Sequence, residues 1–369
     1  MATAKDVIIN DLQYIVDQGI DSFEKMANKS LLVTGGAGFI GYYLVQSILH
    51  WNQINPAKTI KLTIYDNLMR GVPDWLAQLD AQGGLQLVKH DISNPLPEDM
   101  EAFDFILHGA TIASPLYYRK FPIETMDANV RGVRSLLEKC RVQKEEGHPV
   151  EGFLFFSSSE IYGDPLAEHI PTPETYWGNV SCTGPRACYD ESKRYGETLC
   201  INFAQQYKLP IKIVRPFNNY GPGLKITDKR VLPDFARNMF DNHDMVMYSD
   251  GSATRTFCYI ADAVVGYFKV LVHGTPGEAY NIGAGSPEIS VYELAQMVAK
   301  IGRDSYSYSG EIVRKINQDA MYLTDSPNRR CPDISKAQKD LQYQPGISLA
   351  DGLQRTLIWY LENRNVEEE

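Results

Sequence analysis

The sequence predicts an α/β protein built on a doubly wound parallel sheet, with a smaller C-terminal lobe. Short apolar segments alternate with longer segments of helical periodicity between residues 30 and 216. Parallel strands joined by helices give this alternation, because each connection must return the chain to the same edge of the sheet. A glycine cluster between the first strand and the helix that follows is a second sign of the same fold.

Strands are expected where short apolar runs are bounded by polar or turn residues. The predicted strands of the sheet cover residues 31–33, 61–65, 85–89, 104–108, 152–156 and 210–214. Helices are expected where apolar residues recur with a period of about 3.6. The predicted helices cover residues 39–49, 122–140 and 188–207, with a closing helix inside 338–363.

The glycine cluster has the spacing of a turn that binds a dinucleotide. Gly35, Gly38 and Gly41 are three residues apart, directly after the first predicted strand and at the start of a helix that includes Phe39 and Ile40. The missing side chains let backbone N–H groups and the helix N-terminus approach a pyrophosphate. We therefore expect these five residues to belong to the cofactor site of a Rossmann domain.

An acidic residue ends the second predicted strand. Asp66, followed by Asn67, is placed to hydrogen-bond the ribose hydroxyls of adenosine and to repel a 2′-phosphate. This position favours NAD over NADP as the cofactor. Asp91 and Ile92 follow the third predicted strand, and we expect them to border the adenine.

The rhythm of the elements predicts how the chain is divided. Residues 1–29 form an N-terminal extension with a weak amphipathic pattern, for which we expect packing on the surface or at a subunit contact. Residues 30–216 and 257–284 are expected to form the NAD-binding Rossmann domain. Residues 217–256 and 285–369 contain shorter units and are expected to form the substrate-binding lobe and the closing helix.

Composition agrees with a soluble protein. The 369 residues are 44% hydrophobic, which is enough for a large core. No apolar run has the length of a membrane span and the N-terminus does not resemble a signal peptide, so we expect a cytoplasmic protein without a membrane partner. The six cysteines lack the spacing of metal ligands, and the net charge of −10 argues against binding to nucleic acid.

Ser158, Tyr189 and Lys193 form a candidate group for proton transfer. Tyr189 and Lys193 are four residues apart in a predicted helix, so their side chains project from one face. An ammonium group near the phenol is expected to lower the pKa of Tyr189 from its usual value of about 10. Ser158, at the end of a predicted strand, could bind the same substrate hydroxyl. With NAD as hydride acceptor, these residues predict the oxidation of a hydroxyl group.

Together these features resemble the extended short-chain dehydrogenase/reductase family, which contains nucleotide-sugar epimerases, dehydratases and decarboxylases. The resemblance covers residues 31–363. Within the family the chain is most similar to the UDP-glucuronate decarboxylases, through segments at residues 157–165, 176–179, 184–191, 217–222 and 329–333. The resemblance implies an NAD-dependent enzyme that acts on a nucleotide sugar, with a UDP-sugar as the expected substrate.

Positions 159 and 160 help to separate three activities of this family. A 4,6-dehydratase is expected to have Asp and then Glu here, because it must protonate a leaving hydroxyl, and Ser159 cannot do so. A 4-epimerase has no need for Glu160. In the decarboxylases the resemblance assigns catalytic duty to the glutamate and to a distant arginine, which here are Glu160 and Arg330. It therefore favours decarboxylation of UDP-glucuronate to UDP-xylose through a 4-keto intermediate, with a 4-epimerase or a 4,6-dehydratase as the alternatives.

The resemblance also implies where the substrate is held. Tyr118 lies in the segment that is near the sugar in the decarboxylases. Asn218 and Arg255 resemble residues that hold the nucleotide diphosphate, and Arg230 is expected to contribute to the same contact. The helices predicted at residues 122–140 and 188–207 resemble the pair that forms a dimer interface in the family, so a homodimer is expected.

Two departures leave the substrate open. Residues 111–112 and 182–183 differ from the family pattern, so neither the sugar nor the nucleotide base is fixed by the sequence. A protein that only binds NAD, without catalysis, belongs to a different class. Such a protein is expected to have lost Tyr189 or Lys193, and this chain retains both.

Overall fold

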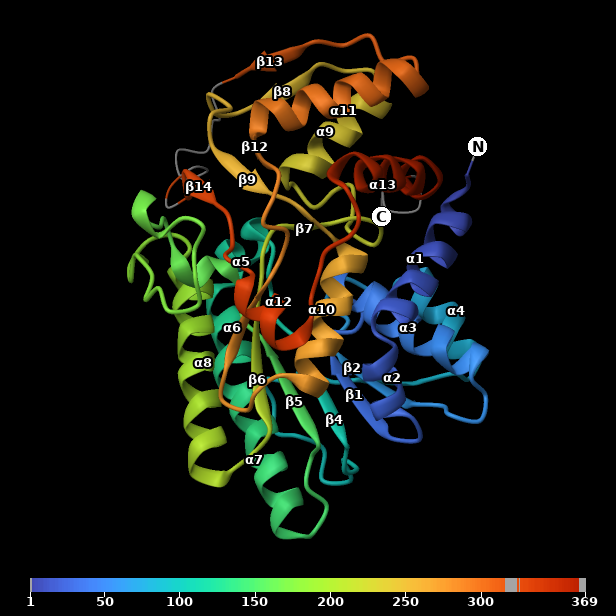
Figure 1. Cartoon of the computed structure of the whole chain (residues 1–369), viewed down its shortest axis with the longest axis vertical. Helices are drawn as coiled ribbons and strands as arrows, with labels where there is room; N and C mark the ends of the chain where they lie inside the picture. The colour runs from blue at the N-terminus through green and yellow to red at the C-terminus, as the bar shows by residue number, and fades with distance from the viewer. Residues whose placement is uncertain (1, 316–323, 325, 365–369) are drawn as a thin grey trace.

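The computed structural model describes residues 2–315, 324 and 326–364 of the chain. A parallel β-sheet lies between two layers of helices, and a smaller group of helices and short strands covers one end of it (Figure 1). The predicted α/β class with a doubly wound parallel sheet is confirmed.

Seven parallel strands form the sheet in the order β11-β6-β5-β4-β1-β2-β3. Their bounds are Ser30–Thr34 (β1), Lys61–Asp66 (β2), Gln86–Lys89 (β3), Phe105–His108 (β4), Gly152–Phe156 (β5), Ile211–Pro216 (β6) and Ala279–Ile282 (β11). The direction in which strands are added reverses between β1 and β4. In sheets of this kind ligands bind at the carboxyl ends of the strands beside such a reversal.

Alternate residues of each strand fill the two faces of the sheet. In β1, Leu31 and Val33 pack into one hydrophobic core, and Leu32 packs into the other. In β5, Leu154 belongs to the first core and Phe153 to the second. Because both faces are buried, the strands read as continuous apolar runs, which is why the sequence pattern located them to within two residues.

Two layers of helices cover these faces. The helices α3 (Phe39–Ile54) and α10 (Ile260–His273) pack against the first core. The helices α7 (Val133–Glu145) and α8 (Ala187–Tyr207) pack against the second. The helix predicted at residues 122–140 extends to Glu145 and contains a wider turn, so its three parts are α6 (Pro122–Asp127), a π-helical turn (Ala128–Gly132) and α7.

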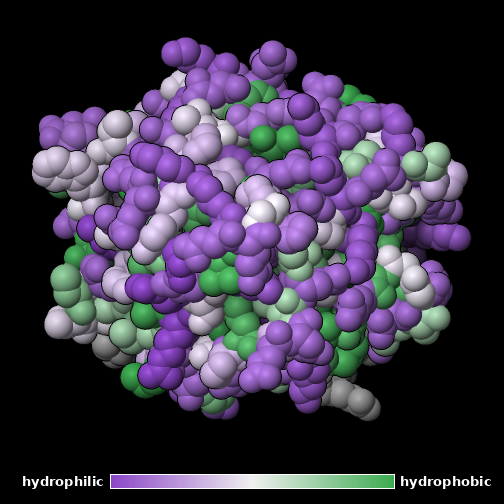
Figure 2. Space-filling view, turned by 90° about the horizontal axis from the view of Figure 1, so that it is seen from below, coloured by the Kyte–Doolittle hydropathy of each residue, from purple (hydrophilic) through white to green (hydrophobic). Residues whose placement is uncertain are grey.

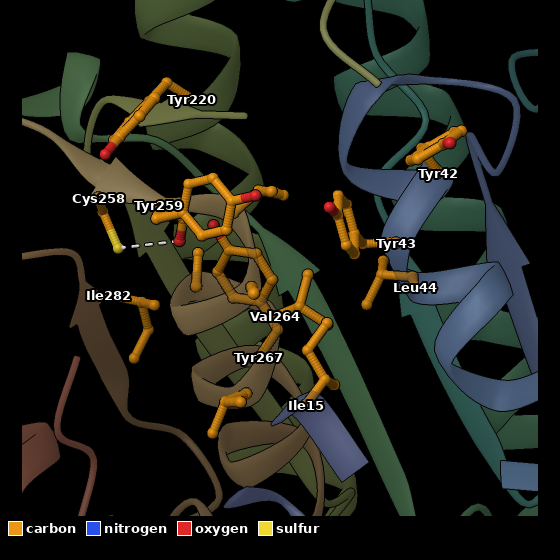
Figure 3. Packing of buried hydrophobic residues seen from close by; sticks show 14 of the residues in the cluster. Ile15, Tyr42, Tyr43, Leu44, Tyr220, Cys258, Tyr259, Val264, Tyr267 and Ile282 are labelled. Atoms are coloured by element: carbon orange, nitrogen blue, oxygen red, sulfur yellow. Dashed lines mark hydrogen bonds between the residues drawn. The ribbon is translucent and has the colours of Figure 1, made fainter. Parts of the chain in front are cut away.

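The N-terminal extension does not only cover the surface, as expected from its weak pattern, but contributes to the main core. It forms α1 (Ala4–Gln18) and α2 (Ile20–Met26). Ile15 is fully buried, and Figure 3 shows it among side chains of α3 and α10 such as Tyr43 and Val264. The extension is thus part of the folded unit that also contains the glycine turn.

Shorter elements make up the smaller lobe, at the top of Figure 1. They include α9 (Val231–Phe240), β8 (Met245–Met247), β9 (Thr254–Thr256), β12 (Glu288–Ser290), α11 (Val291–Ser305), β13 (Ile312–Arg314) and β14 (Arg329–Arg330). The remaining elements are α4 (Asp74–Ala81), α5 (Pro115–Lys120), β7 (Asn219–Tyr220), β10 (Cys258–Tyr259), α12 (Ser335–Leu341) and α13 (Leu349–Asn363). The predicted domain boundaries stay a prediction, and residues 316–323, 325 and 365–369 of the predicted lobe lie outside the described residues.

The surface is mainly polar on the face seen from below, where hydrophobic residues are scattered (Figure 2). Within the described ranges, no helix has both the length and the apolar character needed to cross a membrane. The same ranges contain no cluster of three or more His, Cys, Asp or Glu side chains that could hold a metal ion.

Candidate active site

A cavity of about 1380 Å³ lies at the carboxyl ends of the strands and extends to the smaller lobe. Every residue predicted for the site lines it. These residues are Gly35, Gly38, Phe39, Ile40, Gly41, Asp66, Asn67, Asp91, Ile92, Tyr118, Ser158, Ser159, Glu160, Tyr189, Lys193, Asn218, Arg230, Arg255 and Arg330. The fold therefore brings together residues up to 295 positions apart, between Gly35 and Arg330, while the role of each residue stays a prediction.

The glycine turn makes a close approach that a side chain would prevent. Gly35 has a positive φ of 76°, and a Cβ atom there would lie 2.8 Å from the backbone of Ala110. A Cβ atom on Gly41 would lie 2.6 Å from the carbonyl carbon of Gly36. The absence of side chains thus lets the turn pack closely against neighbouring backbone, and Gly35 and Gly41 both line the cavity.

The N-terminus of α3 opens toward the same cavity. Gly38 is the N-cap of this helix and offers no side chain to its first N–H groups. These N–H groups belong to Phe39, Ile40 and Gly41, which line the cavity. Free N–H groups at a helix N-terminus favour an anion such as a phosphate.

Asp66 links the end of β2 to the glycine turn. Its Oδ2 accepts a hydrogen bond from the Ala37 N–H at 3.0 Å, and its Oδ1 accepts one from the Leu68 N–H at 2.8 Å. Burial raises the pKa of this carboxyl group. Each oxygen retains a second lone pair, so the carboxylate can still accept from ribose hydroxyls. Beside it, the Asn67 amide donates to Asp91 at 3.2 Å.

Tyr189 and Lys193 lie on α8 as predicted, but the predicted effect on the pKa of Tyr189 is wrong for this structure. Burial raises the pKa of Tyr189 to about 12, although a hydrogen bond with Ser158 opposes the rise. The Lys193 ammonium donates instead to the Phe156 carbonyl at 2.6 Å and lies 5.8 Å from the centre of the Tyr189 ring. Burial also lowers the pKa of Lys193 to about 7.

Tyr118 fixes one face of Tyr189. The two rings are stacked, with centroids 5.3 Å apart and planes inclined by 14°. The Tyr118 hydroxyl is buried and has no hydrogen-bond partner among the residues that the structure describes. Burial raises the pKa of this phenol above its ordinary value. The hydroxyl is thus a neutral polar group at the cavity wall with its donor and acceptor both available.

Glu160 is held between two arginines. It lies in a short 3₁₀ turn after β5, between Ser159 and Tyr162, and the buried Ser159 precedes it. Its Oε2 accepts from Nη2 of Arg330 at 2.9 Å, and further short hydrogen bonds join it to Nη1 of Arg330 and Nη2 of Arg186. Burial alone would raise the pKa of Glu160, but Arg330 and Arg186 hold it well below the ordinary value.

Arg186 is the residue of this cluster that sequence reasoning did not assign. It precedes Tyr189 by three residues and is the N-cap of α8, outside the helix predicted at residues 188–207, so the helical spacing did not assign it. Its contact with Glu160 was not readable, because 26 residues separate them and the loop between has no regular pattern.

The residues predicted for the diphosphate are engaged with the protein itself. Arg255 donates to the carbonyls of Thr254 at 2.7 Å and Pro327 at 2.5 Å. The Asn218 amide donates to the Thr256 carbonyl at 2.9 Å. Arg230, at the N-terminus of α9, lies 2.9 Å from Asp228. Their binding to a substrate stays a prediction.

Comparison with known proteins identifies the family. The sequence profile of the "NAD dependent epimerase/dehydratase family" matches residues 31–283. This chain belongs to that family. The predicted family is therefore confirmed, and NAD is the cofactor of its members. The glycine turn at the cavity wall, followed by the N-terminus of α3, and the carboxylate at the end of β2 both fit this cofactor.

Relatives of this epimerase/dehydratase family member share most of its length. UDP-glucuronic acid decarboxylase 1 of Arabidopsis thaliana is 36% identical over 339 residues, which are 92% of this chain and 71% of the relative. UDP-glucuronic acid decarboxylase 1 of Xenopus tropicalis is 32% identical over 336 residues, 90% of this chain and 72% of the relative. A dTDP-glucose 4,6-dehydratase from Streptomyces venezuelae, solved with NAD bound, has a TM-score of 0.76 and 28% identity, and the match covers 92% and 98% of the two chains.

Proposed function

We propose that this protein is an NAD-dependent carboxy-lyase that converts UDP-glucuronate to UDP-xylose through a 4-keto intermediate. The observation that carries the proposal is the ionised Glu160, held between Arg186 and Arg330 in the cavity that also contains Ser158 and Tyr189. Relatives named UDP-glucuronic acid decarboxylases, which match about nine-tenths of the chain, support it.

The proposed cofactor contacts follow from the cavity wall. Gly35 and the first N–H groups of α3, on Phe39 to Gly41, would hold the pyrophosphate. Asp66 would accept from the adenosine ribose, and Asn67 with its partner Asp91 would border the adenine next to Ile92. Bound there, NAD supplies the oxidation at C4 of the sugar by accepting a hydride, and returns that hydride within the same turnover.

At C4, Tyr189 takes the hydroxyl proton and Ser158 orients the hydroxyl. The high pKa of Tyr189 means that its phenolate needs stabilisation, and its hydrogen bond with Ser158 supplies part of it. Lys193 Nζ lies 5.8 Å from the centre of the same ring, so its amine, when protonated, places a positive charge near the phenolate. Tyr118 keeps the Tyr189 ring in place by stacking.

The second part of the reaction is the loss of the carboxylate. A ketone at C4 is β to the carboxylate on C5, so the C5–C6 bond breaks and its electron pair passes through C5 to the C4 oxygen as an enolate. Ser158 and Tyr189 donate to that oxygen, which is where the negative charge develops. A proton of solvent origin then adds to C5, and we assign to the ionised Glu160 and to Arg330 the orientation of the water or sugar during this step. Carbon dioxide leaves, and the 4-keto pentose is reduced at C4.

One experiment separates this activity from its alternatives. The purified protein with UDP-glucuronate in heavy water should release carbon dioxide and give UDP-xylose with one deuterium at C5. A 4-epimerase would instead give UDP-galacturonate without loss of carbon dioxide, and a 4,6-dehydratase offered UDP-glucose would accumulate a 4-keto-6-deoxy sugar. Either result would overturn the decarboxylase. The serine at position 159, where a dehydratase needs an acid, speaks against the second alternative.

We also propose that the enzyme is a cytoplasmic homodimer whose contact is formed by α6 and α8. Ile123 and Met126 on α6 are 64% and 41% exposed, and Tyr195 on α8 is 48% exposed, which gives these helices apolar side chains for a partner. Light scattering should report twice the mass of the 41.6 kDa chain, and Ile123→Glu should give the single mass. A monomeric unmodified protein would overturn the contact.

A further inference from the structure

We infer that Arg186 binds the carboxylate of a hexuronate substrate and thereby selects acidic over neutral nucleotide sugars. The inference rests on the proposed function in one respect, because it takes an acidic sugar as the substrate. It adds a role for a residue that neither the motifs nor the comparisons assign.

Arg186 lies where it can reach the carboxylate on C5, next to the C4 hydroxyl that reacts. It lies at the start of α8, where its carbonyl accepts from the Tyr189 N–H at 3.0 Å. Arg186 also lies close enough to Tyr118 for its charge to lower the pKa of that phenol against the effect of burial, and Tyr118 stacks on the ring of Tyr189. Its contact with Glu160, two residues after Ser158, places it on the same side of the cavity. The carboxylate of a hexuronate is on C5, directly beside the C4 that Tyr189 and Ser158 address.

Arg186 has more N–H groups free for a ligand than Arg330 has. Arg330 donates to Glu160 through both of its Nη atoms. Arg186 donates to Glu160 through Nη2 alone. Its Nε is buried and has no hydrogen-bond partner in the part of the chain that the structure describes, and Asp190 is 3.8 Å away, beyond hydrogen-bond distance. The Nε of Arg330 is also buried without a hydrogen-bond partner among the described residues, but both Nη atoms of Arg330 already bind Glu160.

A buried donor without a partner calls for an explanation, because folded proteins satisfy nearly all such groups. A carboxylate can accept two parallel hydrogen bonds from one guanidinium, and such charge-assisted bonds are about twice as strong as neutral ones. Arg186 can form them with a ligand while Arg330 keeps Glu160 in place.

The charges of the cluster are balanced within the protein. The guanidinium groups of Arg186, Arg255 and Arg330 are opposed by three carboxylates, those of Glu160, Asp190 and Asp164. Burial, Arg330 and Arg186 lower the pKa of Arg255 to about 10, which shows that the positive charges lie close enough to repel one another. Recognition of a substrate carboxylate therefore depends on the free donors of Arg186 and not on an excess of positive charge.

The test measures binding rather than turnover. In a Tyr189→Phe background, which prevents consumption of the ligand, calorimetry compares UDP-glucuronate with UDP-glucose, whose C5 bears a neutral CH₂OH group. Arg186→Met should weaken UDP-glucuronate binding by at least about tenfold, the scale for a lost charge-assisted pair, and change UDP-glucose binding by less than about threefold. Arg186→Lys keeps the charge without the fork and should fall in between. Arg141→Met, which removes an arginine from ion pairs on α7, should leave both affinities unchanged.

The two proposals fail in different ways. An equal loss for both ligands, or no loss for either, in variants with unchanged thermal unfolding would overturn the role of Arg186. If the unmodified enzyme releases no carbon dioxide from UDP-glucuronate, the decarboxylase is overturned. A selective loss of UDP-glucuronate binding in Arg186→Met would even then support carboxylate recognition.

Discussion

Two carboxylates that accept hydrogen bonds from several side chains, the buried Asp11 in the N-terminal extension and the partly exposed Glu160 in the cavity, differ in their pKa shifts and in what they can do. Asp11 is 0% exposed and accepts from the hydroxyls of Tyr43 and Tyr259, each at 2.5 Å, and from Arg355 at 2.6 Å. Glu160 accepts from two arginines. Burial raises the pKa of Asp11 despite its three donors, whereas the two cations hold the pKa of Glu160 well below its ordinary value.

The two sites differ in whether the side chains that bind the carboxylate keep free hydrogen-bond donors. Asp11 joins α1 to α3, β10 and α13, and it does not line the cavity. At Glu160 the partners Arg186 and Arg330 each keep a buried Nε without a hydrogen bond within the described residues. A polar cluster whose donors are used up within the protein holds elements together, while one with donors to spare at a cavity wall can bind a ligand.

The largest expected effect is on stability, at Asp11. Asp11→Ala should lower the free energy of unfolding by about 2–6 kcal/mol, because the buried hydroxyls of Tyr43 and Tyr259 lose their acceptor at a cost of about 1–3 kcal/mol each. Activity per folded molecule should be retained, because Asp11 does not line the cavity. Urea unfolding and turnover at a temperature where the variant is folded would measure both.

A matched control lies on the same helix. Asp17 is exposed and accepts a hydrogen bond from Gln13 at 2.8 Å, so Asp17→Ala should change the free energy of unfolding by no more than about 0.5 kcal/mol. A loss in Asp11→Ala no larger than that of the control would contradict the structural role of Asp11.

The second prediction is that replacing Glu160 reduces activity more than stability, the reverse of the result expected at Asp11. Glu160→Gln keeps the shape of the side chain and removes its charge, so turnover should fall by at least about tenfold, as expected when a charged group that orients the reactants is lost. The unfolding midpoint should move less than in Asp11→Ala, because the amide oxygen of glutamine can still accept a hydrogen bond from an arginine and the side chain at position 160 is partly exposed. Glu168→Gln, at a carboxylate that is 75% exposed, serves as the control and should keep full turnover. Near-normal turnover in Glu160→Gln would remove Glu160 from the mechanism.

The sequence located the elements on which the cavity depends. The strands that carry Asp66 and Ser158 at their carboxyl ends were predicted to within two residues, because strands buried on both faces are continuous apolar runs. The topology rule then placed the glycine turn and these residues at one edge of the sheet, and all of them line one cavity.

Burial and long-range pairing were beyond the sequence. The spacing of Tyr189 and Lys193 was right, but their pKa values depend on burial, which outweighs the effect of the ammonium group. The partners of Asp11 lie 32 to 344 residues away, and a charged residue in a weak amphipathic pattern gives no sign that it will be buried. The contribution of residues 1–29 to the core was missed for that reason.

The third prediction is that Asp11 and Glu160 contribute to stability with opposite dependence on pH. The pKa of Asp11 is raised from 3.8, so its contribution to stability is fully present below about pH 3.8 and is lost as the pH rises through the raised pKa. The pKa of Glu160 is lowered from 4.5, so its contribution is present above about pH 4.5 and is lost as the pH falls. Each difference of one in pKa between the folded and unfolded chain corresponds to about 1.4 kcal/mol.

Unfolding free energies at a series of pH values would show these opposite slopes. The advantage of the unmodified protein over Asp11→Asn should shrink as the pH rises from about 3.8, while its advantage over Glu160→Gln should grow up to about pH 4.5 and then stay constant. Parallel slopes for the two variants would mean that the carboxylates ionise alike, and would contradict the comparison.

The smallest expected effect is at the cation beside Asp11. Arg355 is 34% exposed, so water screens its attraction to Asp11, and the two tyrosine hydroxyls remain when it is replaced. Arg355→Met keeps much of the aliphatic side chain and should lower the free energy of unfolding by only about 0.5–1 kcal/mol. The urea midpoint should shift without a change in slope. If the loss instead equals that of Asp11→Ala, the arginine and not the pair of tyrosines holds the buried carboxylate, and Asp11 would resemble Glu160 in depending on cations.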